Sequence, residues 1–120
     1  MSKVLIVDDS PTETHVMRTA LEKNGFEVVT AEDGESGLKA ARELLPDVII
    51  MDVVMPGVNG FQATRKLTKD PHTANIPVII VTSKDQPTDE VWGLRQGAVA
   101  YFVKPVTADT LLSKVREVCG

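Results

Sequence analysis

The chain has 120 residues, of which 42% are hydrophobic, and a formal net charge of −4. This length suits one domain with its own core, and the acidic balance, with no cluster of Lys and Arg, excludes nucleic acid as an expected partner. No apolar stretch is long enough to cross a bilayer and no signal-peptide pattern opens the chain, so we expect no membrane insertion. Cys119 is the one cysteine, which excludes an intrachain disulfide and suits the cytoplasm, where we expect the protein to reside.

Apolar runs and helical patterns alternate five times along the chain. Each short apolar run, rich in β-branched residues, predicts a strand buried on both faces, and each pattern of period 3.6 predicts a helix. The expected strands span residues 3–7, 26–30, 48–51, 78–81 and 101–103. The expected helices follow caps at Ser10, Asp33, Asn59 and Thr107, with one more helix from about Thr88 to Gln96.

The helix after Ser10 should carry Pro11 at its first position and Glu13 as the second partner of a capping box. The helix over 88–96 has few large apolar residues, so we expect it to dock most weakly, and its Trp92 suits a core edge and a docking face equally well. The residues predicted to face inward are Val16, Met17, Ala20 and Leu21, then Leu38, Ala41 and Leu45, then Phe61, Ala63 and Leu67, and finally Leu111, Leu112, Val115 and Val118.

Strands that alternate with helices imply right-handed crossovers and a parallel sheet that is covered on both faces. Of the two common strand orders, the flavodoxin-like order 2-1-3-4-5 places the first and third strands side by side. The predicted fold is therefore an α/β, flavodoxin-like, doubly wound five-stranded sheet with five helices, in a single domain over residues 1–120.

Residues able to do chemistry follow four of these strands directly. They are Asp8-Asp9, Asp52, Thr82 and Lys104-Pro105. Because the carboxyl ends of parallel strands share one edge, we expect these groups to meet there, with the Asp52 carboxylate pointed toward water. Taken singly, Asp8 and Asp9 could simply cap the following helix. Thr82 could end its strand without any functional role, and Lys104 could be an ordinary surface charge. Because such residues follow four strands of one short chain, a functional site is the favoured interpretation.

Three neighbouring carboxylates repel one another unless a cation joins them. Mg²⁺ is the natural choice, because it takes one or two carboxylates and keeps waters and a phosphate oxygen as further ligands. Lys104 adds a positive charge and Thr82 a hydrogen-bond donor. Together these groups describe a phosphoryl-transfer site in which Asp52, on the central strand, is the nucleophile.

The whole chain resembles the receiver domains of bacterial two-component response regulators, the CheY-like family. The matching motifs are Asp8-Asp9, Asp52, Met55-Pro56-Gly57 with Gly60, Thr82, Gly97-Ala98 and Lys104-Pro105. Among receivers, the segments at 60–65, 82–86 and 92–98 are most similar to those of the PilH-type regulators. Those regulators belong to a chemotaxis-like system that controls type IV pili and twitching motility.

The resemblance implies a role for each matching residue. Asp52 would accept the phosphoryl group from a sensor histidine kinase, and Lys104 would contact that group. Asp9, Asp52 and the backbone carbonyl of Val54 would bind Mg²⁺, with Asp8 acting through water or as a further ligand. Thr82 and Tyr101 would move together as a switch, although Tyr101 alone suits an ordinary half-buried aromatic equally well, and the Lys104–Pro105 bond would be cis. Ser83 departs from the small apolar residue that is usual there.

The resemblance also implies how the signal leaves the molecule. The chain stops after the fifth predicted helix, so we expect no output domain and a monomer that signals by docking to another protein. The docking surface would consist of the helix over 88–96, the strand over 101–103 and the last helix. The protein would not be an enzyme in its own right, although it would assist its own phosphorylation and dephosphorylation.

Three other functions stay open from the residues alone. An aspartyl-phosphate phosphatase or mutase needs a second aspartate two residues after the nucleophile, and Val54 stands there. A flavin-binding electron carrier needs a hydroxyl- and Gly-rich phosphate loop, where this chain has the acidic Asp8-Asp9-Ser10-Pro11. A receiver that acts by binding alone would have no use for the acceptor, metal and lysine residues, which are intact here.

Overall fold

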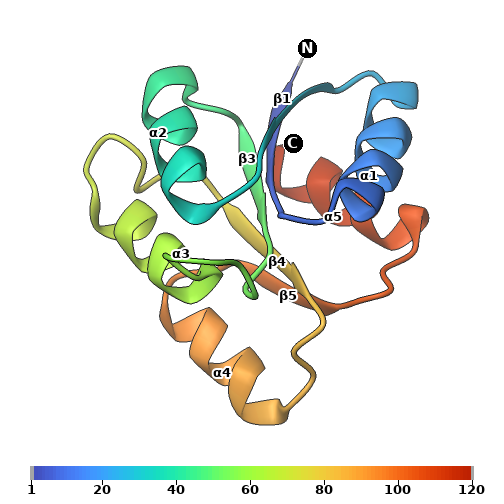
Figure 1. Cartoon of the computed structure of the whole chain (residues 1–120). Helices are drawn as coiled ribbons and strands as arrows, with labels where there is room; N and C mark the ends of the chain where they lie inside the picture. The colour runs from blue at the N-terminus through green and yellow to red at the C-terminus, as the bar shows by residue number, and fades with distance from the viewer. Residues whose placement is uncertain (1, 120) are drawn as a thin grey trace.

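The computed structural model describes residues 2–119, in which five parallel strands alternate with five helices (Figure 1). The sheet order is β2-β1-β3-β4-β5, so the predicted fold is confirmed. The strands are β1 (Lys3–Val7), β2 (Glu27–Ala31), β3 (Val48–Met51), β4 (Val78–Thr82) and β5 (Ala100–Val103). The helices are α1 (Pro11–Lys23), α2 (Gly34–Leu44), α3 (Gly60–Lys69), α4 (Pro87–Arg95) and α5 (Ala108–Cys119).

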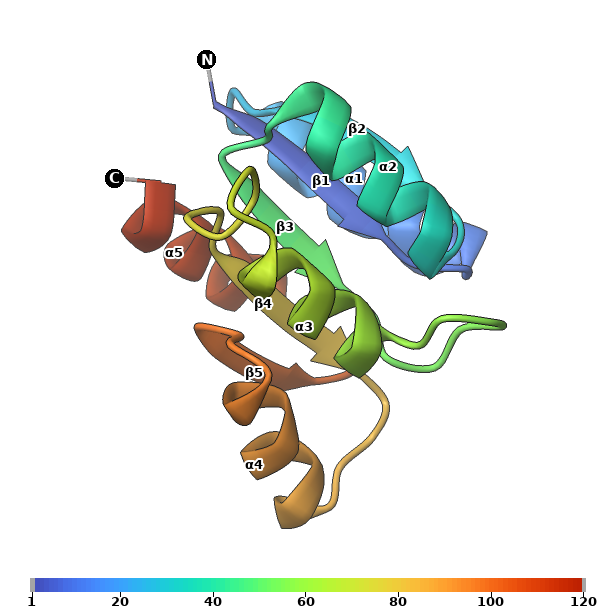
Figure 2. The same ribbon diagram turned by 90° about the vertical axis from the view of Figure 1, so that its left-hand side faces the viewer.

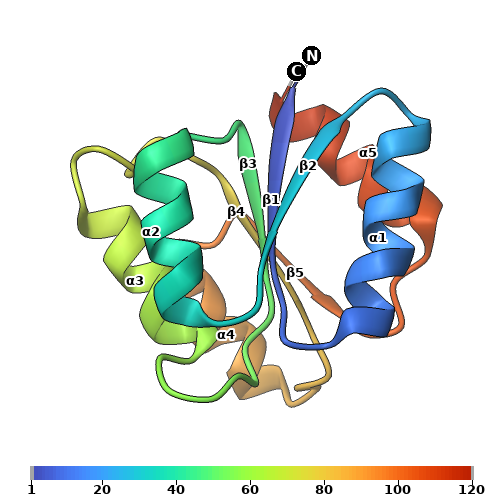
Figure 3. The ribbon, with the colours of Figure 1, turned by 45° about the horizontal axis from the view of Figure 1, so that its top comes forward.

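The sheet lies between two layers of helices, with α1 and α5 on one face and α2, α3 and α4 on the other (Figures 2 and 3). Successive side chains of a strand point to opposite faces. In β1, Val4 and Ile6 join the core under α1 and α5, whereas Leu5 and Val7 join the core under α2 and α3. This two-sided burial accounts for the continuous apolar runs of the central strands.

Element boundaries differ from the predicted ones by one residue. β2 is shifted by one residue at each end, β4 extends to Thr82, and β5 begins at Ala100, which pairs with Ile79. The longer β4 reflects the Lys104 amide, which donates to the Thr82 carbonyl at 2.8 Å. α4 begins at Pro87 because the preceding Gln86 amide donates to the Asp89 carboxylate at 3.2 Å.

Two apolar side chains that were predicted to face inward are exposed. Met17 and Leu21 form the buried face of α1, and Val16, about 100° away around the helix, is 62% exposed. Leu45 is 56% exposed because α2 ends at Leu44 and Leu45 adopts a left-handed φ of 46°. Val118 is only partly buried, packed at the edge of the core under α1 and α5.

The weak docking expected for α4 is confirmed. Gly93 is its buried position, whereas Val91, Trp92 and Leu94 are all near half exposure. A side chain at residue 93 would meet Tyr101 and Ile80, so this glycine sets how closely α4 approaches the sheet. Trp92 is therefore a surface residue of α4. Among the helices of residues 2–119, none has the length and apolar character that a bilayer crossing requires.

Candidate functional site

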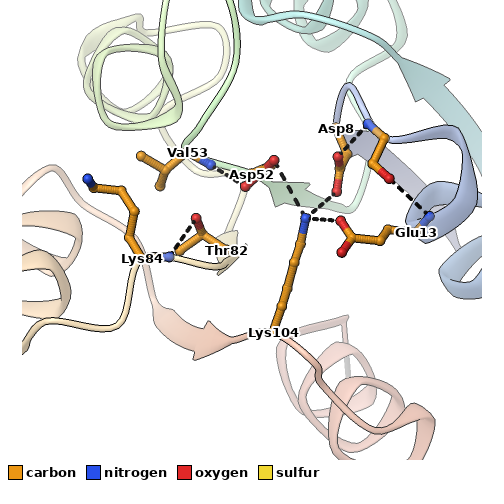
Figure 4. A network of polar contacts seen from close by, with 8 residues as sticks. Asp8, Glu13, Asp52, Val53, Thr82, Lys84 and Lys104 are labelled. Carbon is orange, nitrogen blue, oxygen red and sulfur yellow. Dashed lines mark hydrogen bonds and ion pairs between the residues drawn. The ribbon is translucent and has the colours of Figure 1, made fainter.

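The strand ends bring the predicted site residues together at one edge of the sheet (Figure 4). β1 and β3 are neighbours, and the Asp52 amide donates to the Val7 carbonyl at 2.9 Å. Asp8, Asp9 and Asp52 each offer a carboxylate oxygen, and these oxygens lie within 4.8 Å of one another. The strand order alone therefore assembles the three carboxylates.

Asp52 is buried, which corrects the expectation that its carboxylate faces water. The residue is 5% exposed, and its Oδ1 accepts a hydrogen bond from the Val53 amide at 2.8 Å. Val53 and Met55 are themselves buried, so the loop after β3 folds inward. Gly60 permits this packing, because a Cβ atom there would lie 1.9 Å from the Asp52 carbonyl oxygen.

Lys104 reaches the carboxylates from β5, on the far side of β4 (Figure 4). Its Nζ lies 2.9 Å from Oδ2 of Asp8 and 3.6 Å from Oδ2 of Asp52, and it also contacts Oε2 of Glu13. The lysine side chain is 13% exposed, and the Lys104–Pro105 bond is cis. One ammonium group thus faces three carboxylates.

The charges of the site do not balance within the protein. Burial raises the pKa of Asp52, and repulsion from Asp8 adds to this effect, while Lys104, the Val53 amide and Thr82 act in the opposite direction. Burial alone would lower the pKa of Lys104, but its hydrogen bonds to Glu13 and Asp8 raise it above the ordinary value. An excess of negative charge remains among oxygens that are close together, and a hard divalent cation with oxygen ligands fits this donor set.

Asp9 and Val54 lie at the outer side of the site. Asp9 is exposed, so its carboxylate is accessible to an ion that enters from solvent. Val54 follows two residues after Asp52 in the loop and is 55% exposed, which leaves an apolar surface beside the Asp52 carboxylate. Binding of Mg²⁺ by the backbone carbonyl of Val54 stays a prediction.

Thr82 and Tyr101 are connected through the backbone of Lys84. Thr82 is fully buried, and its hydroxyl accepts from the Lys84 amide at 3.4 Å. The Tyr101 hydroxyl donates to the Lys84 carbonyl at 2.9 Å, and its ring packs on a cluster formed by Val53, Phe61, Ile80 and Ala98. The pKa of Tyr101 is raised to about 12, first by burial and then by the nearby carboxylates, Asp89 foremost among them.

Residues 4–116 match the family of response regulator receiver domains. The chain belongs to this family. The receiver is 58% identical over 118 residues to Protein PilH of Pseudomonas aeruginosa, and the match covers 98% of each chain. It is 39% identical over 116 residues to the response regulator PleD of Caulobacter vibrioides, of which it covers 26%.

Solved structures agree with the receiver fold. The chemotaxis protein CheY4 of Vibrio cholerae matches with a TM-score of 0.91 and 35% identity, over 98% of both chains. A putative response regulator of Chloroflexus aurantiacus matches with a TM-score of 0.94 and 30% identity, over 98% of this chain and 97% of the other. The CheY-like, PilH-type resemblance read from the motifs is thereby confirmed.

Glu13 is a residue of the receiver's site that the sequence reasoning missed. The Ser10 hydroxyl accepts from the Glu13 amide at 3.4 Å, as a cap should, but the Glu13 carboxylate turns to Lys104 instead of completing the capping box. No local pattern in the sequence marks this contact, because Glu13 and Lys104 are 91 residues apart in the chain.

Proposed function

We propose that this receiver is the phospho-acceptor of a two-component phosphorelay, with Asp52 as the phosphorylated residue. The arrangement of Asp52 carries the proposal, because its carboxylate lies 3.6 Å from the Lys104 ammonium group and beside the oxygens of Asp8 and Asp9. An Asp52 oxygen would attack the phosphorus of a phosphohistidine donor. The new O–P bond forms as the donor's N–P bond breaks, and the imidazole that leaves takes up a proton.

The neighbouring groups would stabilise the negative charge on the oxygens of the transferred phosphoryl group. Lys104 supplies a fixed positive charge, and Thr82 supplies a hydroxyl that can donate to a phosphoryl oxygen. Asp9, Asp52 and the Val54 carbonyl would hold Mg²⁺, with Asp8 as a water-mediated or direct further ligand. When bound, Mg²⁺ would neutralise charge on the oxygens in transfer.

A phosphoryl-donor protein would approach the receiver beside Lys104. A shallow apolar hollow of about 220 Å³ lies beside Lys104, lined in part by Val16, Met17, Pro105 and Val106. It suits the approach of a donor protein to Asp52. The 58% identity to Protein PilH supports a chemotaxis-like sensor histidine kinase as that donor, in the cytoplasm, and control of type IV pili and twitching motility as the process.

Output would leave from the surface of α4, β5 and α5. The backbone of Lys84 joins Thr82, at the site, to Tyr101, on β5 and against α4. The half-exposed Val91, Trp92 and Leu94 of α4 offer apolar area to a docking protein. A change at Thr82 would thus shift the population of Tyr101 positions and the surface that a partner reads.

Phosphotransfer from a purified chemotaxis-type histidine kinase tests this function. The kinase is first labelled with radioactive phosphate and then mixed with the receiver and Mg²⁺. We expect label to leave the kinase and appear on the receiver, and to stay on the kinase when Asp52→Asn is used. Equal labelling of the variant would place the acceptor elsewhere.

A further inference from the structure

We propose that Glu13 is a positioning residue that holds Lys104 in the unphosphorylated state and releases it when a phosphoryl group arrives on Asp52. This inference rests on the proposed function. It assigns to the first turn of α1 a part in setting how readily the receiver takes up phosphate.

Lys104 has only a few hydrogen-bond donors to share among its neighbours. A lysine ammonium group has three N–H donors and no acceptor. Three carboxylates surround it, those of Asp8 at 2.9 Å, Asp52 at 3.6 Å and Glu13 in direct contact (Figure 4). Each donor therefore has a carboxylate to face. A phosphoryl group on Asp52 can gain this ammonium group only in competition with one of them.

Burial decides which carboxylate gives way. The side chain of Asp8 is 2% exposed, and its other oxygen accepts from the Ser10 amide at 2.8 Å, so water cannot take the place of Lys104 around this carboxylate. Asp52 carries the phosphoryl group itself. The Glu13 side chain is 45% exposed, so water can replace Lys104 around its carboxylate. Glu13 is thus the partner that Lys104 loses at least cost.

The contact therefore favours the unphosphorylated state. Phosphorylation of Asp52 would break the ion pair between Glu13 and Lys104, which costs the free energy of a partly exposed pair. The released Glu13 carboxylate would also be repelled by the negative charge of the phosphoryl group. Exposed pairs of this kind are worth enough to change an equilibrium constant by about two- to fivefold. Removing the Glu13 charge should shift phosphoryl uptake by a factor of that order.

The test compares Glu13→Gln with Glu35→Gln. Glu35 is a matched control, because it is an exposed acid in the first turn of α2, which also begins at the carboxyl edge of the sheet. The probe is beryllofluoride, a phosphoryl mimic, titrated with Mg²⁺ and followed by NMR. We expect Glu13→Gln to bind it about two- to fivefold more tightly than the parent, and Glu35→Gln to bind it with parental affinity. Unchanged or weaker binding by Glu13→Gln, or an equal gain in both variants, would overturn the proposal.

A second measurement separates this inference from the proposed function. The ammonium protons of Lys104 are observed by NMR in the metal-free, unphosphorylated protein. We expect them to exchange with water faster in Glu13→Gln than in the parent or in Glu35→Gln. Failure of the parent to bind beryllofluoride would refute the proposed function, whereas equal ammonium exchange in all three proteins would refute the role of Glu13.

Discussion

The Lys104 ammonium nitrogen lies 3.6 Å from a carboxylate oxygen of Asp52, although the two residues follow strands that are not neighbours. Lys104 spans the end of β4 to reach it. The ammonium group thus lies near the Asp52 carboxylate already, and on the proposals above the contact with Glu13 is what would change when negative charge develops there. Lys104 stabilises the ionised form of Asp52, but by less than burial destabilises it, since the pKa of Asp52 remains raised.

Asp52→Asn should leave thermal stability unchanged or raise it at neutral pH. Because the pKa of Asp52 is raised in the folded state, the folded protein holds this proton more tightly than the unfolded chain does. Ionised Asp52 thus lowers stability as the pH rises through the unfolded and then the folded pKa, and the variant escapes this loss. Thermal unfolding of both proteins should show the advantage above that range and none below it. A large fall in melting temperature at neutral pH would show instead that the charge of the Asp52 carboxylate, which faces Lys104 at 3.6 Å, is structural.

Leu45→Asn should stabilise the protein by about 0.5–1 kcal/mol. Leu45 has a left-handed φ of 46° and is 56% exposed, so the substitution relieves backbone strain and removes little buried area. Leu44→Asn is the control, because Leu44 is 40% exposed but still helical and asparagine is a poorer helix former. Urea unfolding should give opposite signs for the two variants. A loss at both positions would mean that the exposed leucines contribute packing.

Beryllofluoride should change amide hydrogen exchange along the route from Thr82 to α4 and β5. The Lys84 amide and carbonyl bind Thr82 and Tyr101 respectively, so a shift of the Thr82 hydroxyl toward a phosphoryl oxygen breaks one of these links. Mass spectrometry of exchanged peptides with and without the mimic makes the comparison. Tyr101→Phe, which lacks the hydroxyl, should show a smaller difference around residues 84–95. Changes restricted to α1 and α2 would contradict this route.

Phosphoryl lifetime on Asp52 should shorten in the double variant Val54→Asn with Lys84→Glu. The half-exposed Val54 cannot bind a water, and Lys84, whose Nζ lies 3.9 Å from Oδ1 of Asp89, offers donors but no acceptor to orient one. The gain should fall below the roughly 10²–10⁴-fold of full general base catalysis, because only water positioning is restored. A coupled phosphate-release assay measures the rate. Val54→Asn with Lys84→Leu is the control, because it also loses the contact with Asp89 but adds no acceptor at residue 84. A double variant with Lys84→Glu that is no faster than the parent would refute this explanation of the lifetime.

The fold and the meeting of the site residues could be predicted because both follow from local patterns. Apolar runs mark buried strands, and parallel strands bring Asp8, Asp52 and Lys104 to one edge whatever the details between them. The exposure of Leu45 depends on a single backbone dihedral angle, which hydrophobic periodicity does not encode. Burial of Asp52 depends on how its loop packs, and the Glu13 contact joins residues far apart in the chain. Such tertiary relationships compete with the local capping rule that suggested another role for Glu13.

Intact mass spectrometry after incubation with Mg²⁺ and a small phosphodonor such as acetyl phosphate shows whether Asp52 is the phospho-acceptor. We predict a mass increase of one phosphoryl group in the parent, no increase without Mg²⁺, and none in Asp52→Asn. An unmodified parent, under conditions that label another receiver, would show that Asp52 is not a phospho-acceptor.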